Sequence, residues 1–328
     1  MCTALTLKTT DEKHLFGRTM DLEYNFNQSI IFIPRNYTSI NKHTNLECTN
    51  KYAILGMGTV FNGFPTFSDV MNEKGLACAG LNFPRHAYYY KEEVMGKINI
   101  PVYNFLLHIV SNYSSVKEFK KDVNKIALID EEIFTNVACA TLHFIVTDKT
   151  GASIVIEQTK KGLNVYDNSV GVLTNSPTFD YHMMNLSNYT NISYNLSKPI
   201  TFSKTKITPH GQGNSLLGIP GDISPASRFV RTVILKDGTI KNCKNINVPQ
   251  YFHIMNSVSM VDGVARIKAG LNNITQYTSC MNIDDGIYYY NTYQNYSIMK
   301  IDMHKEDLDG KEIKVFKYNN NFKPIEEN

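Results

Sequence analysis

The residue with the clearest chemical potential is Cys2, which directly follows the initiator methionine. Methionine before a small residue is normally removed during synthesis, so we expect the mature chain to begin with Cys2. An N-terminal cysteine carries a thiol and a free α-amine, and an amine pKa of about 8 leaves part of it neutral at pH 7. The amine can then act as general base for the thiol of its own residue. Cys2 is therefore predicted to be an N-terminal nucleophile.

A cation and a carboxylate follow at hairpin distance, in the segment Gly17-Arg18-Thr19-Met20-Asp21. The thiolate is the reactive form of cysteine, and a nearby cation lowers the thiol pKa below its usual value of about 8.5. We expect Arg18 to lie near the sulfur and Asp21 to hold the α-amine. Taken alone, such a pair in a strand is usually a surface ion pair, and a cysteine at position 2 is nearly uninformative.

Short strands must position these residues. Residues 3–8 alternate in polarity, as a half-buried strand does. Turn residues separate neighbouring strand segments, and such short connections favour antiparallel pairing, because parallel crossovers need about a dozen residues. The other predicted strands are residues 29–33, 53–59, 75–82, 142–147, 152–157, 162–166, 170–174 and a strand-rich, tyrosine-rich end at 277–316.

Helices are predicted between the strand groups, at residues 101–110, 114–124, 178–190, 225–236 and 249–261. The clearest begins after Ser224, an N-cap residue followed by proline, and is expected to end before Gly238. Residues 196–222 are the longest irregular stretch, and a loop of that length is often functional or lies in a subunit contact. The order of elements lacks regular β-α alternation and predicts one α+β domain, residues 2–328, with two antiparallel sheets faced by helices.

Several motifs, in order along the chain, resemble the choloylglycine hydrolase family, which holds bacterial bile salt hydrolases and penicillin V acylases. The resemblance runs from residue 2 to about residue 318. Each motif alone could be an ordinary structural feature, such as a turn. The resemblance depends on all of them occurring in this order along the chain. The motifs are Cys2-Thr3, Gly17-Arg18-x-Met20-Asp21, Asn72-Glu-Lys-Gly75-Leu76 leading to Gly80-Leu-Asn82-Phe, Leu173-Thr-Asn175-Ser-Pro177, Pro225-Ala-Ser-Arg228-Phe229 and Gln276-Tyr-Thr-Ser.

The resemblance implies an N-terminal-nucleophile αββα sandwich that needs no cofactor. It implies Cys2 as the nucleophile, with Arg18 and Asp21 beside its thiol and amine. Asn175 matches the oxyanion donor, with Asn82 helping there or holding the substrate amide. Arg228 matches a network arginine. The resemblance also suggests a homotetramer, with residues 196–222 as a possible contact.

The expected reaction is amide hydrolysis through a thioester on Cys2. Asn82 favours glycine- and taurine-conjugated bile salts, because the bile salt hydrolases that this chain resembles carry asparagine there, whereas penicillin V acylases tend to carry tyrosine. A penicillin V acylase or another N-acyl amidase of the same mechanism is the first alternative. The apolar positions that match family pocket residues could equally be ordinary core. The predicted substrate-binding residues are Met20, Phe26, Phe61, Asn82, Ile133, Val137 and Leu142.

Composition argues against other classes. A net charge of +3, from 33 basic and 30 acidic residues mixed along the chain, does not suggest nucleic acid or an anionic membrane surface. No apolar run approaches the length of about 18 residues that a membrane span needs, and no leader is visible, so we expect a cytoplasmic protein. The six cysteines form no C-x-x-C pair and no zinc spacing with histidine, which predicts free thiols and no metal site.

Two readings from other classes stay open. The first is a catalytically dead binding protein on the same scaffold, against which the intact set of catalytic residues argues. The second is a disulfide-stabilised secreted protein, which six cysteines permit but the missing leader opposes.

Overall fold

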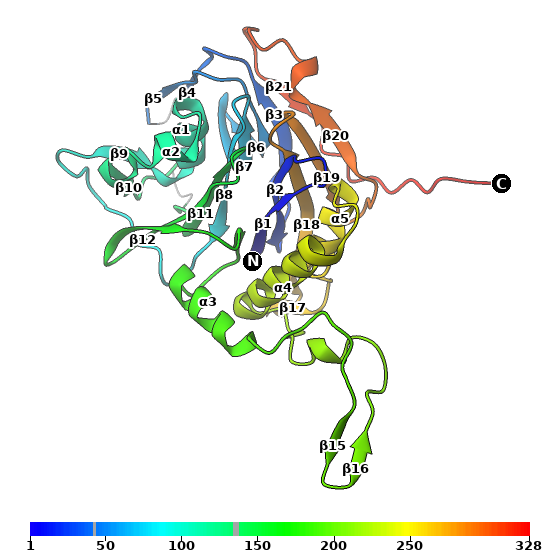
Figure 1. Ribbon diagram of the computed structural model, residues 1–328. Coiled ribbons are helices and arrows are strands. Elements are labelled where there is room, and N and C mark those ends of the chain that lie inside the picture. The colour runs from blue at the N-terminus through cyan, green and yellow to red at the C-terminus, as the bar shows by residue number, and fades with distance from the viewer. Residues whose placement is uncertain (42–43, 134–137) are drawn as a thin grey trace.

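Two large antiparallel sheets pack face to face at the centre of the molecule (Figure 1). The computed structural model describes residues 1–41, 44–133 and 138–328. Within these ranges one sheet has seven strands: β1 (Cys2–Lys8), β2 (His14–Leu22), β14 (Val172–Leu173), β17 (Ala265–Lys268), β18 (Leu271–Asn282), β19 (Ile287–Thr292) and β20 (Met299–Asp302).

The second sheet has eight strands within the same described ranges. In spatial order they are β13 (Gly162–Asp167), β12 (Ser153–Thr159), β11 (Leu142–Asp148), β8 (Leu76–Asn82), β7 (Phe64–Asn72), β6 (Ile54–Phe61), β3 (Ser29–Ile33) and β21 (Lys314–Phe316). Smaller two-stranded ladders lie outside the sandwich: β4 (Thr38–Asn41) with β5 (Leu46–Thr49), β9 (Ile98–Pro101) with β10 (Ile126–Ile129), and β15 (Ile200–Phe202) with β16 (Thr205–Ile207).

Strand β3 shows why the larger sheet is covered on both faces. Ile30 and Phe32 belong to the core shared with the seven-stranded sheet, whereas Ile31 and Ile33 belong to the core on the opposite face. Successive side chains of a strand point to opposite faces. An unbroken apolar run is therefore what a strand with two buried faces requires.

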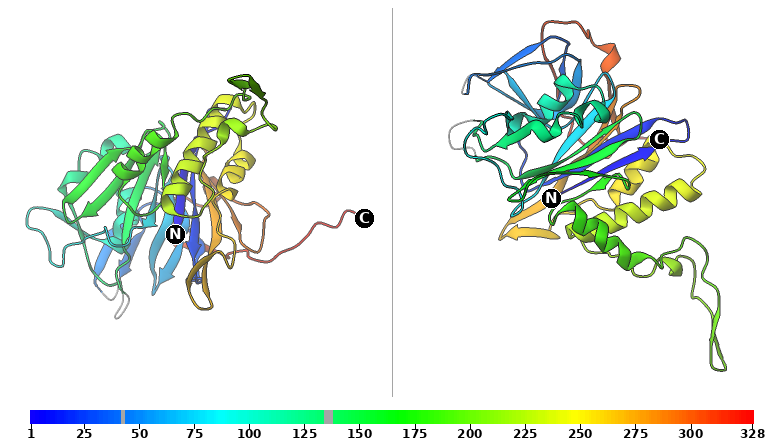
Figure 2. Two further views of the ribbon diagram at one scale, coloured as in Figure 1. Left: turned by 90° about the horizontal axis from the view of Figure 1, so that it is seen from below. Right: turned by 60° about the vertical axis from the view of Figure 1, so that its left-hand side comes forward.

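Helices cover the two outer faces of the sandwich (Figures 1 and 2). Helices α1 (Phe105–Asn112) and α2 (Val116–Phe119) pack on the eight-stranded sheet. Helices α4 (Pro225–Asn242) and α5 (Val248–Asn256) pack on the other sheet, and α3 (Phe179–Asn185) lies against α4. This helix–sheet–sheet–helix order confirms the predicted αββα sandwich. Short 3₁₀ turns complete the helical elements: η1 (Val102–Asn104), η2 (Val123–Lys125), η3 (Leu186–Tyr189), η4 (Asn214–Leu216) and η5 (Met303–Lys305).

Helix α4 begins where it was predicted to begin, but it extends beyond its predicted end. The Ser224 hydroxyl accepts from the Ser227 amide at 3.4 Å, and Pro225 occupies the first turn. The prediction that the helix ends before Gly238 is wrong, because α4 continues to Asn242. A Cβ at Gly238 would lie 2.7 Å from the ring of Tyr194. This glycine therefore makes room for a packed tyrosine instead of ending the helix.

Other element boundaries also differ from expectation. The predicted helix 114–124 is reduced to the short α2 and η2, although Ser115 does cap α2 by accepting from the Glu118 amide. Strands β2 and β7 were not among the predicted strands. Residues 196–222, expected to be irregular, contain the β15–β16 hairpin, which projects from the body of the molecule (Figure 2).

Candidate active site

Cys2 lies at the start of β1, in the interior of the seven-stranded sheet, and is buried. In the β1–β2 ladder Cys2 faces Met20, so Arg18 and Met20 point from β2 to the same side as the sulfur. The Arg18 guanidinium donates to Cys2 Sγ and also contacts Met20 Sδ at 3.4 Å. A cation in contact with the sulfur favours the thiolate, the nucleophilic form.

Gly17 explains how β2 can carry Arg18 so close to β18. A Cβ at Gly17 would lie 2.1 Å from the Ser279 carbonyl oxygen, so no other residue fits between the two backbones. The Arg18 backbone amide donates to Ser279 Oγ at 3.1 Å. Its side chain also donates to the Ser68 carbonyl at 3.2 Å and to the Gly80 carbonyl, so Arg18 spans both sheets.

A second arginine fixes the groups on the nitrogen side of Cys2. The Cys2 backbone nitrogen donates to Asn175 Oδ1 at 2.8 Å, and Arg228 Nη2 donates to the same oxygen at 2.7 Å. Arg228 also donates to the Cys2 carbonyl and to Thr3 Oγ1, each at 2.6 Å. Two donors on one oxygen assign the orientation of the Asn175 amide. Its nitrogen then donates to the Asn82 carbonyl at 2.7 Å.

Asp21 lies beside the residue that precedes Cys2. Its backbone amide donates to the Met1 carbonyl at 2.9 Å, and the Met1 amine donates to the Asp21 carbonyl. The Asp21 carboxylate accepts from Thr275 Oγ1 at 2.7 Å. Burial raises the pKa of Asp21, opposed by the N-terminal amine and Arg228. For the cationic Arg228, burial acts in the opposite direction and lowers the pKa, and the charge of Asp21 opposes this effect.

A cavity of about 660 Å³ opens onto Cys2 between the two sheets. Arg18, Met20 and Asn82 line it, together with a wall of apolar side chains from the eight-stranded sheet, from η1 and α1, and from adjoining loops. That apolar wall consists of Phe61, Phe67, Val102, Leu106, Ile133, Ala138, Ala140 and Leu142. A buried cysteine beside a cavity with an apolar wall and polar side chains along the rest of its lining suits an amphipathic ligand.

Comparison with known proteins identifies the family of this chain. The model of the linear amide C–N hydrolases, choloylglycine hydrolase family, matches residues 2–316. The chain belongs to this family. A bile salt hydrolase/transferase of Clostridium perfringens is 55% identical over 97% of each chain. The predicted family resemblance is confirmed.

Solved structures support the same assignment. A C2A mutant of the conjugated bile acid hydrolase from Clostridium perfringens matches with a TM-score of 0.98 at 53% identity, over 100% of both chains. A penicillin V acylase from Agrobacterium tumefaciens matches with a TM-score of 0.75 at 19% identity, over 96% of this chain and 91% of that chain. The second match shows a shared fold alone.

The six predicted catalytic residues come together in the structure. Arg18, Asn175 and Arg228 contact Cys2 directly, Asp21 contacts Met1, and the Asn82 carbonyl accepts from Asn175. Of the predicted substrate-binding residues, Val137 lies outside the described residues. The others line the cavity: Met20, Phe26, Phe61, Asn82, Ile133 and Leu142.

A buried histidine–glutamate pair behind Asn175 escaped the sequence analysis. His143 Nδ1 lies 2.9 Å from Glu157 Oε1, and His143 Nε2 lies 3.1 Å from the Thr174 carbonyl. His182 Nε2 reaches the Asn175 carbonyl at 2.7 Å. These contacts fix the backbone carbonyls of Thr174 and Asn175, and so the position from which the Asn175 side chain extends. No local motif signals them, because their partners come from three separate segments of the chain.

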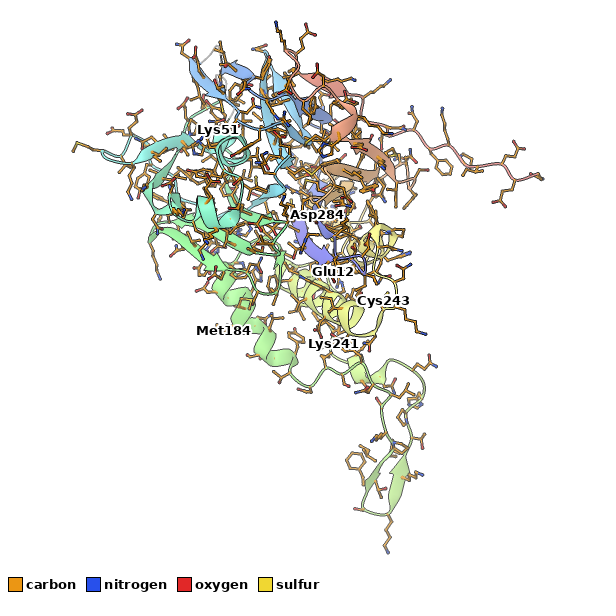
Figure 3. All side chains as sticks on the ribbon, turned by 45° about the horizontal axis from the view of Figure 1, so that its top comes forward. Glu12, Lys51, Met184, Lys241, Cys243 and Asp284 are labelled. Atoms are coloured by element: carbon orange, nitrogen blue, oxygen red, sulfur yellow. The ribbon has the colours of Figure 1, made fainter. Side chains whose placement is uncertain are left out.

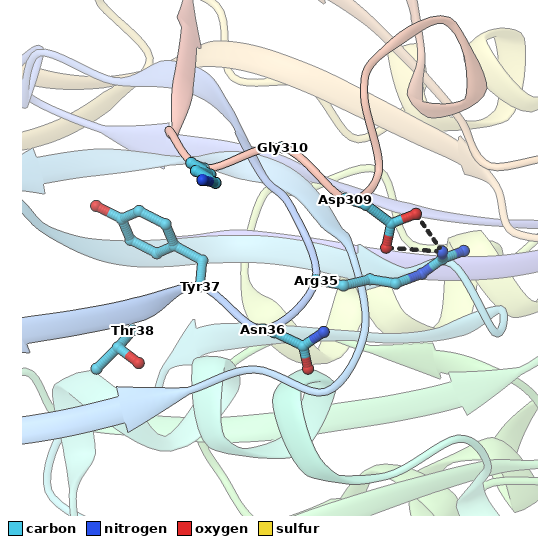
Figure 4. Close-up of a pocket in the computed structure, with 7 residues that line it drawn as sticks. Arg35, Asn36, Tyr37, Thr38, Asp309 and Gly310 are labelled. Atoms are coloured by element: carbon cyan, nitrogen blue, oxygen red, sulfur yellow. Dashed lines mark hydrogen bonds and ion pairs between the residues drawn. The ribbon is translucent and has the colours of Figure 1, made fainter.

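A smaller hollow of about 440 Å³ lies away from Cys2, where the chain after β3 meets the segment before β21 (Figure 4). Its most polar side chain, Arg35, is already paired with Glu73 and Asp309. None of the predicted catalytic residues lines it.

The cysteines and possible metal ligands of the described residues add no further site. The six cysteines are all free thiols. In the same ranges no cluster of three or more histidine, cysteine or acidic side chains is arranged to hold a metal ion. No helix among them is long and apolar enough to cross a membrane.

Proposed function

We propose that this protein hydrolyses the amide bond of glycine- or taurine-conjugated bile salts, with Cys2 as the N-terminal nucleophile. One observation carries the proposal: a cysteine sulfur in contact with a buried arginine faces a cavity with an extensive apolar wall. Relatives that cover nearly the whole chain and are named as bile salt or conjugated bile acid hydrolases supply the substrate class.

The reaction begins with transfer of the thiol proton to the α-amine that Cys2 gains when Met1 is removed. The thiolate attacks the amide carbonyl and forms a tetrahedral intermediate. The protonated amine then gives its proton to the leaving nitrogen, the C–N bond breaks, and glycine or taurine departs from a thioester. Water, deprotonated by the same amine, cleaves the thioester and restores the thiol.

Asn175 and Asn82 are the proposed oxyanion donors. Because Oδ1 of Asn175 already accepts from Arg228 and from the Cys2 nitrogen, its amide cannot turn over without losing both hydrogen bonds. Its nitrogen is thus held in place before substrate arrives, which is the preorganisation that stabilises a developing negative charge. Arg18 stabilises the thiolate, and Asp21 and Arg228 hold the amine side of Cys2.

Side-by-side turnover tests the proposal. Purified protein, shown by intact mass to lack Met1, is incubated with taurocholate, glycocholate and penicillin V, and amine release is measured. We expect fast release from the bile salts, slow release from penicillin V, and none from Cys2→Ala, which should fold normally. Fastest turnover of penicillin V would reassign the protein as an acylase. Full activity with Met1 retained, or in Cys2→Ala, would refute the mechanism.

The assembly and the compartment are part of the same proposal. The family resemblance implies a homotetramer, and the sequence, in which no leader is visible, leads us to expect the bacterial cytoplasm. Light scattering on purified protein and fractionation of cells test these two points separately.

A further inference from the structure

Asp69 is a buried carboxylate that the proposed reaction does not use. It lies on β7 and is 0% exposed. Tyr277 on β18 donates to Oδ2 at 2.7 Å, and Tyr288 on β19 donates to Oδ1 at 2.5 Å. Both tyrosines belong to the seven-stranded sheet, so the carboxylate is held between the two sheets. Burial raises the pKa of Asp69, opposed by the charge of Arg18 and by the hydroxyl donors, which favour the ionised form.

Arg18 is close enough for its charge to interact with this carboxylate, but among the described residues no acidic side chain is in contact with it. Within the described ranges, its acceptors are three backbone carbonyls and two sulfur atoms. Among the described residues no carboxylate oxygen lies within ion-pair distance of its guanidinium. A buried cation is costly unless an anion compensates it. The nearest anions available are the Cys2 thiolate and, beyond direct contact, Asp69.

The catalytic cycle removes one of these two anions. When the thiolate becomes a thioester, its negative charge is lost while Arg18 stays buried. Asp69 remains, one residue beyond the Ser68 carbonyl that Arg18 contacts at 3.2 Å. Burial lowers the pKa of Arg18, but the charges of Cys2, Tyr277, Asp69 and Asp21 outweigh it, so the pKa is raised overall.

We propose that Asp69 is a positioning residue, a permanent counter-ion of Arg18 that limits how strongly Arg18 stabilises the Cys2 thiolate. The inference rests on the proposed role of Cys2 as nucleophile. Two buried arginines, Arg18 and Arg228, are then matched by two carboxylates, Asp69 and Asp21. The thiol and amine of Cys2 can exchange a proton within a site whose fixed charges balance.

The charged and titratable groups that face this site come from several elements. Those near the thiol are Arg18 and Asp21 on β2, Asp69 on β7, Arg228 on α4 and the terminal amine; those near Asp69 are Arg18, Tyr277, Tyr288, Cys78, Cys280 and Tyr251. Asp69 is the group among them whose removal changes the fixed charge beside Arg18 without touching Cys2. Removing a negative charge must favour the thiolate, so the thiol pKa should fall.

The test is the pH dependence of Cys2 alkylation by iodoacetamide, followed by mass spectrometry of the N-terminal peptide. In Asp69→Asn, which keeps the shape of the side chain, we expect the midpoint to fall by about one pH unit. A less basic thiolate is a weaker nucleophile, so the limiting rate at high pH should fall about 3-fold. An unchanged midpoint would overturn the proposal.

Tyr288→Phe is the matched control, because it removes a hydrogen bond from the same carboxylate and keeps the charge. Its alkylation midpoint should stay at the wild-type value or rise. An equal fall of the alkylation midpoint in both variants would mean that the shift reflects loosened packing, and this would overturn the proposal. If Asp69→Asn is unfolded, a lowered midpoint in Tyr288→Phe would overturn the proposal as well. Alkylation needs no substrate, so these outcomes are independent of whether bile salts are hydrolysed.

Discussion

At the scale of single residues, the site separates the two functional groups of Cys2. Arg18 contacts the sulfur, whereas Asn175 accepts from the nitrogen and is itself held by Arg228. Each group therefore has its own partner, and a substitution on one side should leave the other in place.

Cys2 should be the most reactive of the six thiols. Burial raises the pKa of Cys48, Cys78 and Cys280, and of Cys139 to about 12. Cys243, near the C-terminal end of α4, is the half-exposed competitor (Figure 3). We expect iodoacetamide at pH 7 to inactivate in step with labelling of Cys2. Peptide mapping checks this, with Cys243→Ser as control, and even labelling of all six thiols would contradict it.

Asn175→Ala should lower kcat about 10²–10³-fold, equivalent to about 2.7–4 kcal/mol, because it removes a preorganised donor. The thermal midpoint should change little if the Arg228 contacts to Cys2 and Thr3 persist. Steady-state kinetics on the best bile salt gives the answer. A kcat within tenfold of wild type would exclude Asn175 from oxyanion binding.

At the scale of elements, β2 shows what a sequence pattern can miss. Arg18, Thr19 and Asp21 are polar yet buried, and they fall on both faces of the strand, so β2 lacks an apolar signature. The placement of Arg18 beside Cys2 and of Asp21 beside Met1 was nevertheless predictable, because their motif is local. Asp69 was not, since its partners Tyr277 and Tyr288 are 208 and 219 residues away.

In the helices, too, features set by neighbouring residues were predictable and features set by distant residues were not. The start of α4 was predictable, because an N-cap serine and a proline act within one turn. Its end was not, because Gly238 is explained by Tyr194, which arrives from a different segment. Fold class, strand groups and site motifs could thus be predicted, whereas contacts between distant segments could not.

Gly17→Ala should destabilise the protein by about 1–3 kcal/mol, the usual range for overpacking a buried site. The added methyl group would overlap the Ser279 carbonyl and push β2 away from β18. Because Arg18 follows directly, activity at a temperature where the variant is folded should also fall. Urea unfolding and kinetics measure both. The matched control is Gly221→Ala, at an exposed loop position with open space around it and no positive φ.

Helix α1 should make stability depend on pH through His108. Its Nε2 is buried without a partner, and burial, with a smaller contribution from Lys51, lowers the pKa of His108 to about 4. The unfolded chain, with a pKa of about 6.5, binds the proton more readily, so stability falls as pH drops below 6.5. His108 alone should contribute about 2 kcal/mol of loss between pH 7 and pH 5.

Urea unfolding of wild type and His108→Phe at pH 7 and pH 5 checks this expectation. The variant should lose less stability than wild type over that interval. His182, whose pKa burial also lowers to about 4, remains in both proteins and accounts for part of the residual slope. Identical slopes would show that His108 is not buried in neutral form.

At the scale of the whole molecule, the β15–β16 hairpin stands out because it does not pack on the rest of its own chain. It projects from the body of the molecule (Figures 1 and 2), and several of its apolar side chains are exposed. The exposed fractions are 54% for Ile200, 64% for Phe202 and 48% for Ile207. If the protein is a homotetramer, these side chains are the ones we expect to be covered.

Phe202→Asp should therefore weaken assembly, because a charge would be buried in the contact. Light scattering across a dilution series should show smaller species at concentrations where wild type stays assembled. Removal of residues 320–328, which are exposed at the C-terminus, should leave the mass distribution unchanged apart from the shorter chain. Equal assembly of Phe202→Asp and wild type would exclude the hairpin as a contact.

The position of Cys2 also decides how this protein can be handled. Its nucleophile is the start of an interior strand, so an affinity tag or fusion partner at that end would replace the free amine with a peptide bond. The opposite end leaves the sandwich as an exposed tail (Figure 1). Immobilisation on a support, display on a cell or coupling to a second enzyme should therefore use the C-terminus alone.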